Sequence, residues 1–279
     1  MKYLITGANG QLGKELQKLL SERQLNFVAF DSHQLDITDK EKVMSIFEQE
    51  NPDVVFNAAA YTKVDLAEDE GRSQNWQVNV EGTKNIADAV KKYNANLVAV
   101  STDYVFDGMN LGEYKEDDPV NPQNAYGRAK LAGELAISES GANAYIVRTS
   151  WVFGEFGNNF VYTMQRLAES HSKLTVVNDQ MGRPTWTRTL AEFMLHLIET
   201  KSEYGIYQLS NDNTATWYEF AQEILKATSV EVTPVTSAEF PQKAYRPEHS
   251  VMSLEKAKST EFEIPTWQDA LEEFLTTIK

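Results

Sequence analysis

Hydrophobic residues in the first half of the chain alternate between two spacings. Short apolar runs, rich in residues typical of buried strands, alternate with segments whose apolar residues recur every three or four positions, as in an amphipathic helix. Apolar strands that alternate with helices are typical of a parallel sheet covered on both faces. We therefore expect an α/β, Rossmann-type doubly wound sheet, with strands at residues 2–6, 27–31, 53–60, 96–102 and 144–153, and helices at 11–20, 39–51, 73–93 and from about Tyr126.

The pattern changes after about residue 154, where shorter strand candidates mix with helices. This change predicts a dinucleotide-binding domain over residues 1–154, to which one or two later strands return, and a smaller C-terminal α/β lobe over residues 155–279. Strands are expected at 174–178, 205–210 and 230–235, and helices at 158–170, 187–200, 216–227 and 267–278.

Composition and charge exclude several classes of function. The net charge of -15 argues against binding to nucleic acid or to an anionic membrane. The chain has no cysteine, which excludes disulfides, thiolate chemistry and a cysteine-based zinc site. The carboxylates do not cluster with histidines at ligand spacing, so we expect no metal site. The apolar run at the N-terminus is too short for the core of a signal peptide, and no apolar run in the sequence is long enough to span a membrane. We therefore expect a cytoplasmic protein.

The segment TGANGQLG places three glycines between the first strand and the first helix. Glycines there let backbone N–H groups approach a pyrophosphate, and the helix N-terminus favours its negative charge. A carboxylate that ends the second strand, Asp31, would bind ribose hydroxyls and favour NADH, but the residues leave the choice between NADH and NADPH open. The expected cofactor-binding residues are Gly7, Asn9, Gly10, Gln11, Leu12, Gly13, Asp31, Asp36, Ile37, Ala58, Ala59, Ala60, Tyr61, Thr62, Tyr126 and Lys130.

The segments STDYVF and YGRAK suggest the chemistry. The first ends the fourth strand with polar residues, and the second puts Tyr126 and Lys130 four positions apart on one helix face. A nearby ammonium group lowers the pKa of a phenol, which is otherwise near 10. We therefore expect Tyr126 to be a general acid, Lys130 to lower its pKa and hold a nicotinamide ribose, and Thr102 to bind the same substrate oxygen.

These motifs together resemble the extended short-chain dehydrogenase/reductase superfamily. The further segments NAAAYTKVDLAE, RTSWVFGEFGNNFV, VVNDQMGRPT and RPEHSVMS are similar to those of one family within it, the dTDP-4-dehydrorhamnose reductases. The resemblance implies reduction by NADPH or NADH of the C4 ketone of dTDP-4-dehydro-β-L-rhamnose to dTDP-β-L-rhamnose, the last step in making this activated sugar for surface polysaccharide.

The resemblance also implies the residues. Thr102, Tyr126 and Lys130 would be the catalytic set, and residues 155–279 would mainly hold the dTDP group. The substrate-binding residues would be Thr102, Asp103, Tyr104, Tyr126, Trp151, Asn159, Arg183 and Arg246. From the residues alone, each of the two arginines could equally form an ordinary surface ion pair.

Two alternatives remain at this point. One is an epimerase or another reductase of the same superfamily, and the other is a non-catalytic regulatory subunit that binds the cofactor. The partner expected in every case is a small molecule, and the chain would be a monomer or a homodimer.

Overall fold

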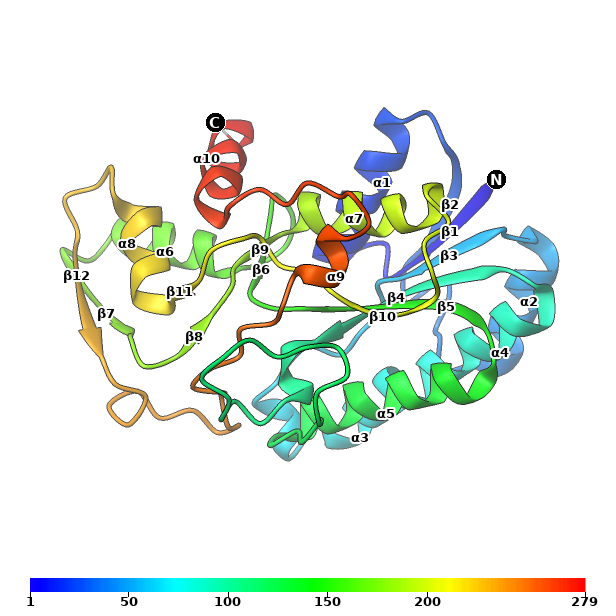
Figure 1. Cartoon of the computed structure of the whole chain (residues 1–279), viewed down its shortest axis with the longest axis horizontal. Helices are drawn as coiled ribbons and strands as arrows, with labels where there is room; N and C mark the ends of the chain where they lie inside the picture. The colour runs from blue at the N-terminus through cyan, green and yellow to red at the C-terminus, as the bar shows by residue number, and fades with distance from the viewer. Residues whose placement is uncertain (279) are drawn as a thin grey trace.

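A six-stranded parallel sheet forms the centre of the molecule. The computed structural model describes residues 1–278 (Figure 1). The strand order is β10-β5-β4-β3-β1-β2. The strands are β1 (Lys2–Thr6), β2 (Asn26–Phe30), β3 (Val54–Asn57), β4 (Asn96–Thr102), β5 (Asn143–Thr149) and β10 (Gly205–Gln208). The order reverses between β1 and β3, and in doubly wound sheets ligands bind at the carboxyl ends of the strands at such a point.

Helices cover both faces of this sheet, as the sequence predicts for a doubly wound fold (Figure 1). On one face, α1 (Gln11–Glu22) packs against α7 (Thr187–Glu199), and their apolar side chains share a core with Tyr3, Ile5 and Val147. On the other face lie α2 (Lys40–Glu50), α4 (Thr83–Tyr93) and α5 (Ala125–Ser140). Each of these two layers buries one stripe of every helix, which is why the helices show an apolar period.

Three elements differ from the sequence prediction. The third strand ends at Asn57, because the alanines that follow turn away next to the glycine loop. The predicted helix at 73–93 is divided into α3 (Arg72–Trp76), a π-helical segment over Gln77–Gly82, and α4. The predicted strand at 144–153 is broken, because Trp151 adopts a left-handed φ of 47°, which separates β5 from β6 (Val152–Phe153).

A second group of elements forms a smaller lobe at the left of Figure 1. It contains α6 (Phe160–Ala168), α8 (Trp217–Leu225) and α10 (Trp267–Thr277), which share an aromatic core that includes Phe153, Phe220 and Phe274. Its strands form three two-stranded sheets: β7 (Lys173–Val177) with β12 (Glu231–Val235), β8 (Met181–Gly182) with β11 (Ala215–Thr216), and β6 with β9 (Thr185–Trp186).

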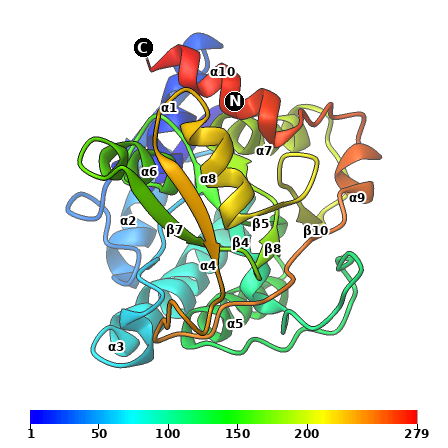
Figure 2. The same cartoon turned by 90° about the vertical axis from the view of Figure 1, so that its left-hand side faces the viewer.

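The chain crosses between the two bodies more than once. Strand β10 pairs with β5 in the main sheet, and α9 (Glu255–Lys258) packs against β10. After β12 the chain runs below the lobe towards α3 and then rises to α9 (Figure 2). Residues from both sides of position 154 contribute to the main sheet and to the smaller lobe. A domain boundary at residue 154 therefore stays a prediction about which residues bind the cofactor and which bind the substrate.

Candidate active site

The turn between β1 and α1 depends on backbone contacts that only glycine permits. Gly7 has a φ of 68°, and a Cβ there would lie 2.7 Å from the backbone of Ala58 and Ala59. A Cβ on Gly13 would lie 2.1 Å from the Gly7 carbonyl oxygen. Helix α1 has no side-chain cap at Gly10, so the first N–H groups of the helix keep their capacity to bind an anion.

A cavity of about 330 Å³ lies against this turn and gathers most of the predicted cofactor residues. The helix N-terminus, the small alanine side chains and the adjacent polar groups fit a dinucleotide that lies across the strand ends. The predicted residues along the cavity are Gly7, Asn9, Gly10, Asp31, Asp36, Ile37, Ala58, Ala59, Ala60 and Tyr61; the sequence did not indicate Ser32, Leu35, Gln74 and Val78, which also line it.

The remaining predicted cofactor residues lie outside this cavity. The Gln11 side chain donates to the carbonyl of Val152 at 3.4 Å, and Leu12 packs against the hydrophobic core. Thr62 is exposed on the loop after β3.

Asp31, which lines the cavity, lies just beyond β2. Its carboxylate accepts hydrogen bonds from Asn9 at 2.7 Å and from two backbone N–H groups of the following turn.

Thr102, Asp103 and Tyr126 meet at the carboxyl end of β4. The Thr102 hydroxyl donates to Asp103 at 3.0 Å and accepts from the Tyr104 N–H at 3.2 Å. Burial and the nearby Asp103 carboxylate raise the pKa of Tyr126, while a hydrogen bond with Thr102 lowers it. The net direction is upward, so the phenol keeps its proton at neutral pH.

Lys130 lies one helical turn after Tyr126 on α5. Its ammonium donates to the Val100 carbonyl at 2.7 Å. Burial lowers the pKa of Lys130 to about 8, and the charge of Glu134 partly offsets that shift. In this arrangement burial, with a smaller effect of Asp103, raises the pKa of Tyr126, and the ammonium of Lys130 is directed to the strand carbonyl. A lowering of the pKa of Tyr126 by Lys130 stays a prediction.

A buried ion pair that the sequence analysis missed anchors α5, the helix that carries Tyr126 and Lys130. Glu134 lies one turn after Lys130 on α5, and both of its oxygens accept from Arg148 of β5, at 3.0 and 2.8 Å. Only 4% of Glu134 and 2% of Arg148 are exposed, and Ser101 of β4 also donates to Glu134. The pair therefore ties α5 to both strands that carry the site. The sequence signal that could have indicated this ion pair is an arginine, Arg148, within the otherwise apolar run AYIVRT.

A second missed group supports the loop after β3. Asn79, inside the π-helical segment, exchanges two hydrogen bonds with the backbone of Tyr61, at 3.1 and 2.9 Å. Asn75 donates to the carbonyl of Ala125 at 3.0 Å, and Glu68 accepts from the Ala125 N–H at 2.7 Å. These buried contacts fix the start of α5, and with it Tyr126. π-helical segments often occur at functional sites.

Two of the predicted substrate residues, Tyr104 and Arg246, lie next to Tyr126, and a third, Trp151, packs within the protein. Tyr104 packs its ring edge against Tyr126, with ring centroids 6.0 Å apart, and the guanidinium of Arg246 lies 5.8 Å from the Tyr104 ring. Trp151 stacks on Trp217 at 3.8 Å, and its indole leaves no room for a side chain at Gly182. One face of Trp151 is thus covered by Trp217, and a substrate contact by Trp151 stays a prediction.

Asn159 and Arg183 have internal partners instead of facing the catalytic group. The Asn159 side chain caps α6 and donates to Gln11 and to the Gly154 carbonyl, so its polar atoms are committed to the fold. Arg183 is 6% exposed and binds Glu113 at 2.6 Å as well as the Met252 carbonyl. Substrate contacts by these two residues stay predictions, and this geometry does not favour them.

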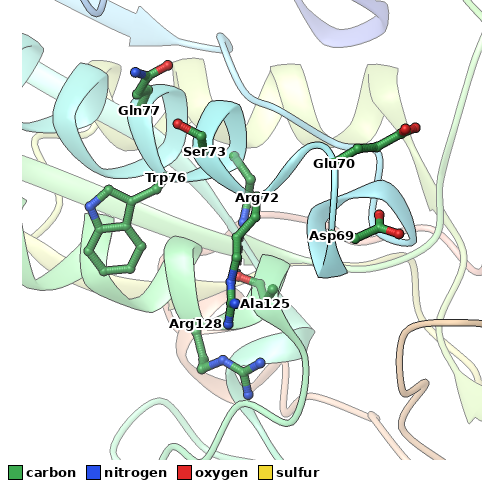
Figure 3. Close-up of a pocket in the computed structure, with 9 residues that line it drawn as sticks. Asp69, Glu70, Arg72, Ser73, Trp76, Gln77, Ala125 and Arg128 are labelled. Atoms are coloured by element: carbon green, nitrogen blue, oxygen red, sulfur yellow. Dashed lines mark hydrogen bonds between the residues drawn. The ribbon is translucent and has the colours of Figure 1, made fainter.

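A separate hollow of about 730 Å³ lies on the outer side of α3 (Figure 3). Arg72, Trp76 and Arg128 line it, and Ala125 places it behind the first turn of α5. It contains none of the predicted site residues, so we assign it no part in catalysis.

Within residues 1–278 no three or more His, Asp or Glu side chains converge as metal ligands. Across the same residues no helix is both long and apolar enough to span a membrane.

Comparison with known proteins agrees with this geometry. The model of the RmlD substrate binding domain family matches residues 1–279. The dTDP-4-dehydrorhamnose reductase of Aggregatibacter actinomycetemcomitans is 41% identical over 97% of both chains. Two solved structures named dTDP-4-dehydrorhamnose reductase are also similar. That from Bacillus anthracis, in complex with NADP, has a TM-score of 0.95 at 39% identity and 99% coverage of each chain.

The second structure, from Clostridium acetobutylicum, has a TM-score of 0.96 at 42% identity, covering 100% of this chain and 99% of that one. The similarity thus includes both the sheet with its glycine turn and the smaller lobe. The chain belongs to the RmlD substrate binding domain family, which includes the dTDP-4-dehydrorhamnose reductases.

Proposed function

We propose that this protein reduces the C4 ketone of dTDP-4-dehydro-β-L-rhamnose to dTDP-β-L-rhamnose with NADPH or NADH. The observation that carries the proposal is the position of Thr102 and Tyr126 together at the end of β4, beyond a dinucleotide cavity. The full-length similarity to proteins named for this reaction, one of them in complex with NADP, supports the choice of substrate and cofactor.

The cofactor site fits the residues present. The uncapped start of α1 and the glycine contacts would hold a pyrophosphate, and Asp31 with Asn9 would lie near the adenosine ribose. A bound nicotinamide supplies the hydride. Lys130, directed to the end of β4 by its hydrogen bond to Val100, would bind the hydroxyls of the second ribose.

Tyr126 is the proposed proton donor. Its raised pKa keeps the phenol protonated at neutral pH, and the reduced C4 oxygen is more basic than a phenolate, so proton transfer from Tyr126 to that oxygen is favourable. The Thr102 hydroxyl lies beside the phenol, and its single hydrogen is donated to Asp103. If that hydrogen turns from Asp103 to the substrate, Thr102 would donate to the same oxygen as negative charge develops on it. Tyr126 is held in place before substrate arrives, because α5 is anchored by Glu134 and Asn75.

The smaller lobe, mainly within residues 155–279, is the proposed site of the dTDP group, and the guanidinium of Arg246, 5.8 Å from the Tyr104 ring, is the proposed cation for it. We further propose that the enzyme acts in the cytoplasm as a monomer or a homodimer. The absence of cysteine and the net charge of -15 support a small-molecule substrate in a reducing compartment. The product would serve the synthesis of surface polysaccharide.

The test is the oxidation of NADPH or NADH, followed by the loss of absorbance near 340 nm, with dTDP-4-dehydrorhamnose as substrate. Tyr126→Phe should retain cofactor affinity and lose at least about a hundredfold in kcat, the range for a general acid. Folded wild-type protein that oxidises neither cofactor would remove the proposed reaction. Turnover by Tyr126→Phe at the wild-type rate would show that another group donates the proton. Formation of an epimer of the sugar without net oxidation of NADPH or NADH would favour the epimerase alternative.

A further inference from the structure

Residues 243–250, here called the strap, connect the two bodies across the catalytic face (Figure 2). On the side of the smaller lobe, the Glu248 carbonyl accepts from the Met181 N–H at 2.7 Å, and the Ser250 N–H donates back to Met181 at 2.9 Å. On the side of the main sheet, Asn124, the N-cap residue of α5, donates to the Tyr245 carbonyl at 3.0 Å. The strap thus bridges a lobe strand and the helix that carries Tyr126.

Asp65, on the loop after β3, holds the strap at two points. One carboxylate oxygen accepts from the Ala244 N–H at 2.9 Å, and the other accepts from Nη2 of Arg246 at 2.8 Å. The Arg246 side chain is 14% exposed and Asp65 is 45% exposed, so the arginine is the more deeply buried partner. A charge-assisted hydrogen bond in such a place restricts the guanidinium to one orientation.

That orientation places Arg246 beside the catalytic residues. Its guanidinium lies over the ring of Tyr104, which packs edge-on against Tyr126. Two of its nitrogens are used, one for Asp65 and one for the Ala244 carbonyl at 3.3 Å. A guanidinium has five N–H donors in a fixed plane, so donors remain for a bidentate contact with an anion. Asp65 offsets the net charge of the guanidinium, so the contribution of Arg246 to binding a phosphorylated substrate would be the directed hydrogen bonds of these remaining donors.

We infer that Asp65 is a positioning residue for substrate recognition, which seats the strap on the main domain and orients Arg246 towards the diphosphate of a nucleotide sugar. The inference rests on the proposed function for the identity of the sugar, but only on the contacts above for the diphosphate. Asp65 does not touch the reacting atoms and acts through Arg246. Its loss should therefore weaken diphosphate binding much more than it affects the chemical step.

The same loop and the same strap provide a matched control. Asp69 forms an ion pair with Lys243, but about half of each of these two side chains is exposed, and neither touches Arg246. Exposed ion pairs contribute little to stability or position. Asp69→Asn removes one negative charge from the same loop as Asp65→Asn does. The two variants have the same net charge and differ in whether the substituted carboxylate holds Arg246 and the Ala244 N–H.

The experiment measures the Kd of dTDP by calorimetry and the steady-state constants for dTDP-4-dehydrorhamnose. We expect Asp65→Asn to raise the Kd and the KM of the nucleotide ligands about tenfold, which corresponds to about 1.4 kcal/mol, with kcat within about threefold and the KM of NADPH unchanged. Asp69→Asn should resemble the wild type in all four quantities. In the background of Arg246→Gln, Asp65→Asn should have no further effect on the Kd of dTDP, because its effect passes through the arginine.

Each outcome of this experiment supports or contradicts the positioning role of Asp65. If Asp65→Asn binds dTDP as the wild type does, or more tightly, the positioning role is wrong. If Asp65→Asn weakens binding equally with and without Arg246, Asp65 stabilises only the loop, and the inference also fails. If the wild type binds dTDP in an Asp65-dependent way but turns over no dTDP-4-dehydrorhamnose, the inference stands and the proposed reaction is wrong.

Discussion

Asp103 offers the most quantitative test of the electrostatics of the site. The residue is 3% exposed, and one carboxylate oxygen, Oδ2, has no hydrogen-bond partner within residues 1–278. Burial raises the pKa of Asp103 from 3.8 to about 6, against the opposing effect of hydrogen bonds that include one from Thr102. The folded state therefore prefers the protonated acid, whereas the unfolded chain ionises near pH 4.

The sign and size of the effect follow from this difference. Between pH 4 and pH 6 the folded state binds more protons than the unfolded state at this residue, so the free energy of unfolding falls as pH rises. A pKa difference between 3.8 and about 6 corresponds to about 3 kcal/mol. The contribution of Asp103 is most favourable below pH 4 and is lost as pH rises through about 6.

The assay is urea unfolding of the wild type and Asp103→Asn at intervals from pH 4 to pH 7. Asparagine has the same shape and no charge, so the variant should gain about 3 kcal/mol relative to the wild type across this range. Asp107→Asn is the control, because hydrogen bonding, chiefly from Tyr114, lowers the pKa of Asp107 and predicts a dependence of opposite sign. A difference between wild type and Asp103→Asn that stays constant with pH would refute the reasoning.

Three further predictions concern other parts of the site. If the cation of Lys130 is needed, kcat/KM should fall above about pH 8, and Lys130→Arg should move that fall to higher pH; a profile flat to pH 10 would contradict this. Arg148→Met should lower the free energy of unfolding by about 3–5 kcal/mol, because Glu134 is left buried without its partner, and Glu134→Gln in the same chain should recover part of it, both read from urea unfolding. Gly7→Ala should weaken NADPH binding at least tenfold in a fluorescence titration, whereas Gly141→Ala, with a similar φ of 66° and its nearest atom 3.8 Å away, should leave that affinity unchanged.

Much of the main domain could be predicted because its signals are local. The glycine turn follows β1 directly, the polar end of β4 follows an apolar run, and the pair Tyr126 and Lys130 lies within one helical turn. Such patterns are set by strand and helix periods, which a sequence displays over five to fifteen residues. The change of pattern after residue 154 also predicted the lobe, although its short strands carry a weaker pattern, and the family resemblance then suggested that the lobe holds the dTDP group.

What the sequence could not show has a common cause, which is that the decisive partner is distant in the chain. The pKa of Tyr126 depends on Asp103 and on burial more than on the neighbouring lysine, and burial is not visible in the spacing of two residues. The ion pair that the sequence analysis left open for Arg183 forms with Glu113, 70 positions away, and a substrate contact by Arg183 stays a prediction. The left-handed backbone at Trp151 follows from its stacking on Trp217 and its contact with Gly182, neither of which is near it in the sequence.

The sequence alone determined the order of strands and helices, the glycine approach to a dinucleotide, and the presence of a phenol, a hydroxyl and an ammonium group on adjoining elements. Tertiary structure decided which charges face one another: Glu134 with Arg148 beneath α5, and Asp65 with Arg246 beside the catalytic tyrosine. Periodicity is a property of neighbouring residues, whereas an ion pair between residues 181 positions apart exists only after the sheet and the strap have brought two loops together.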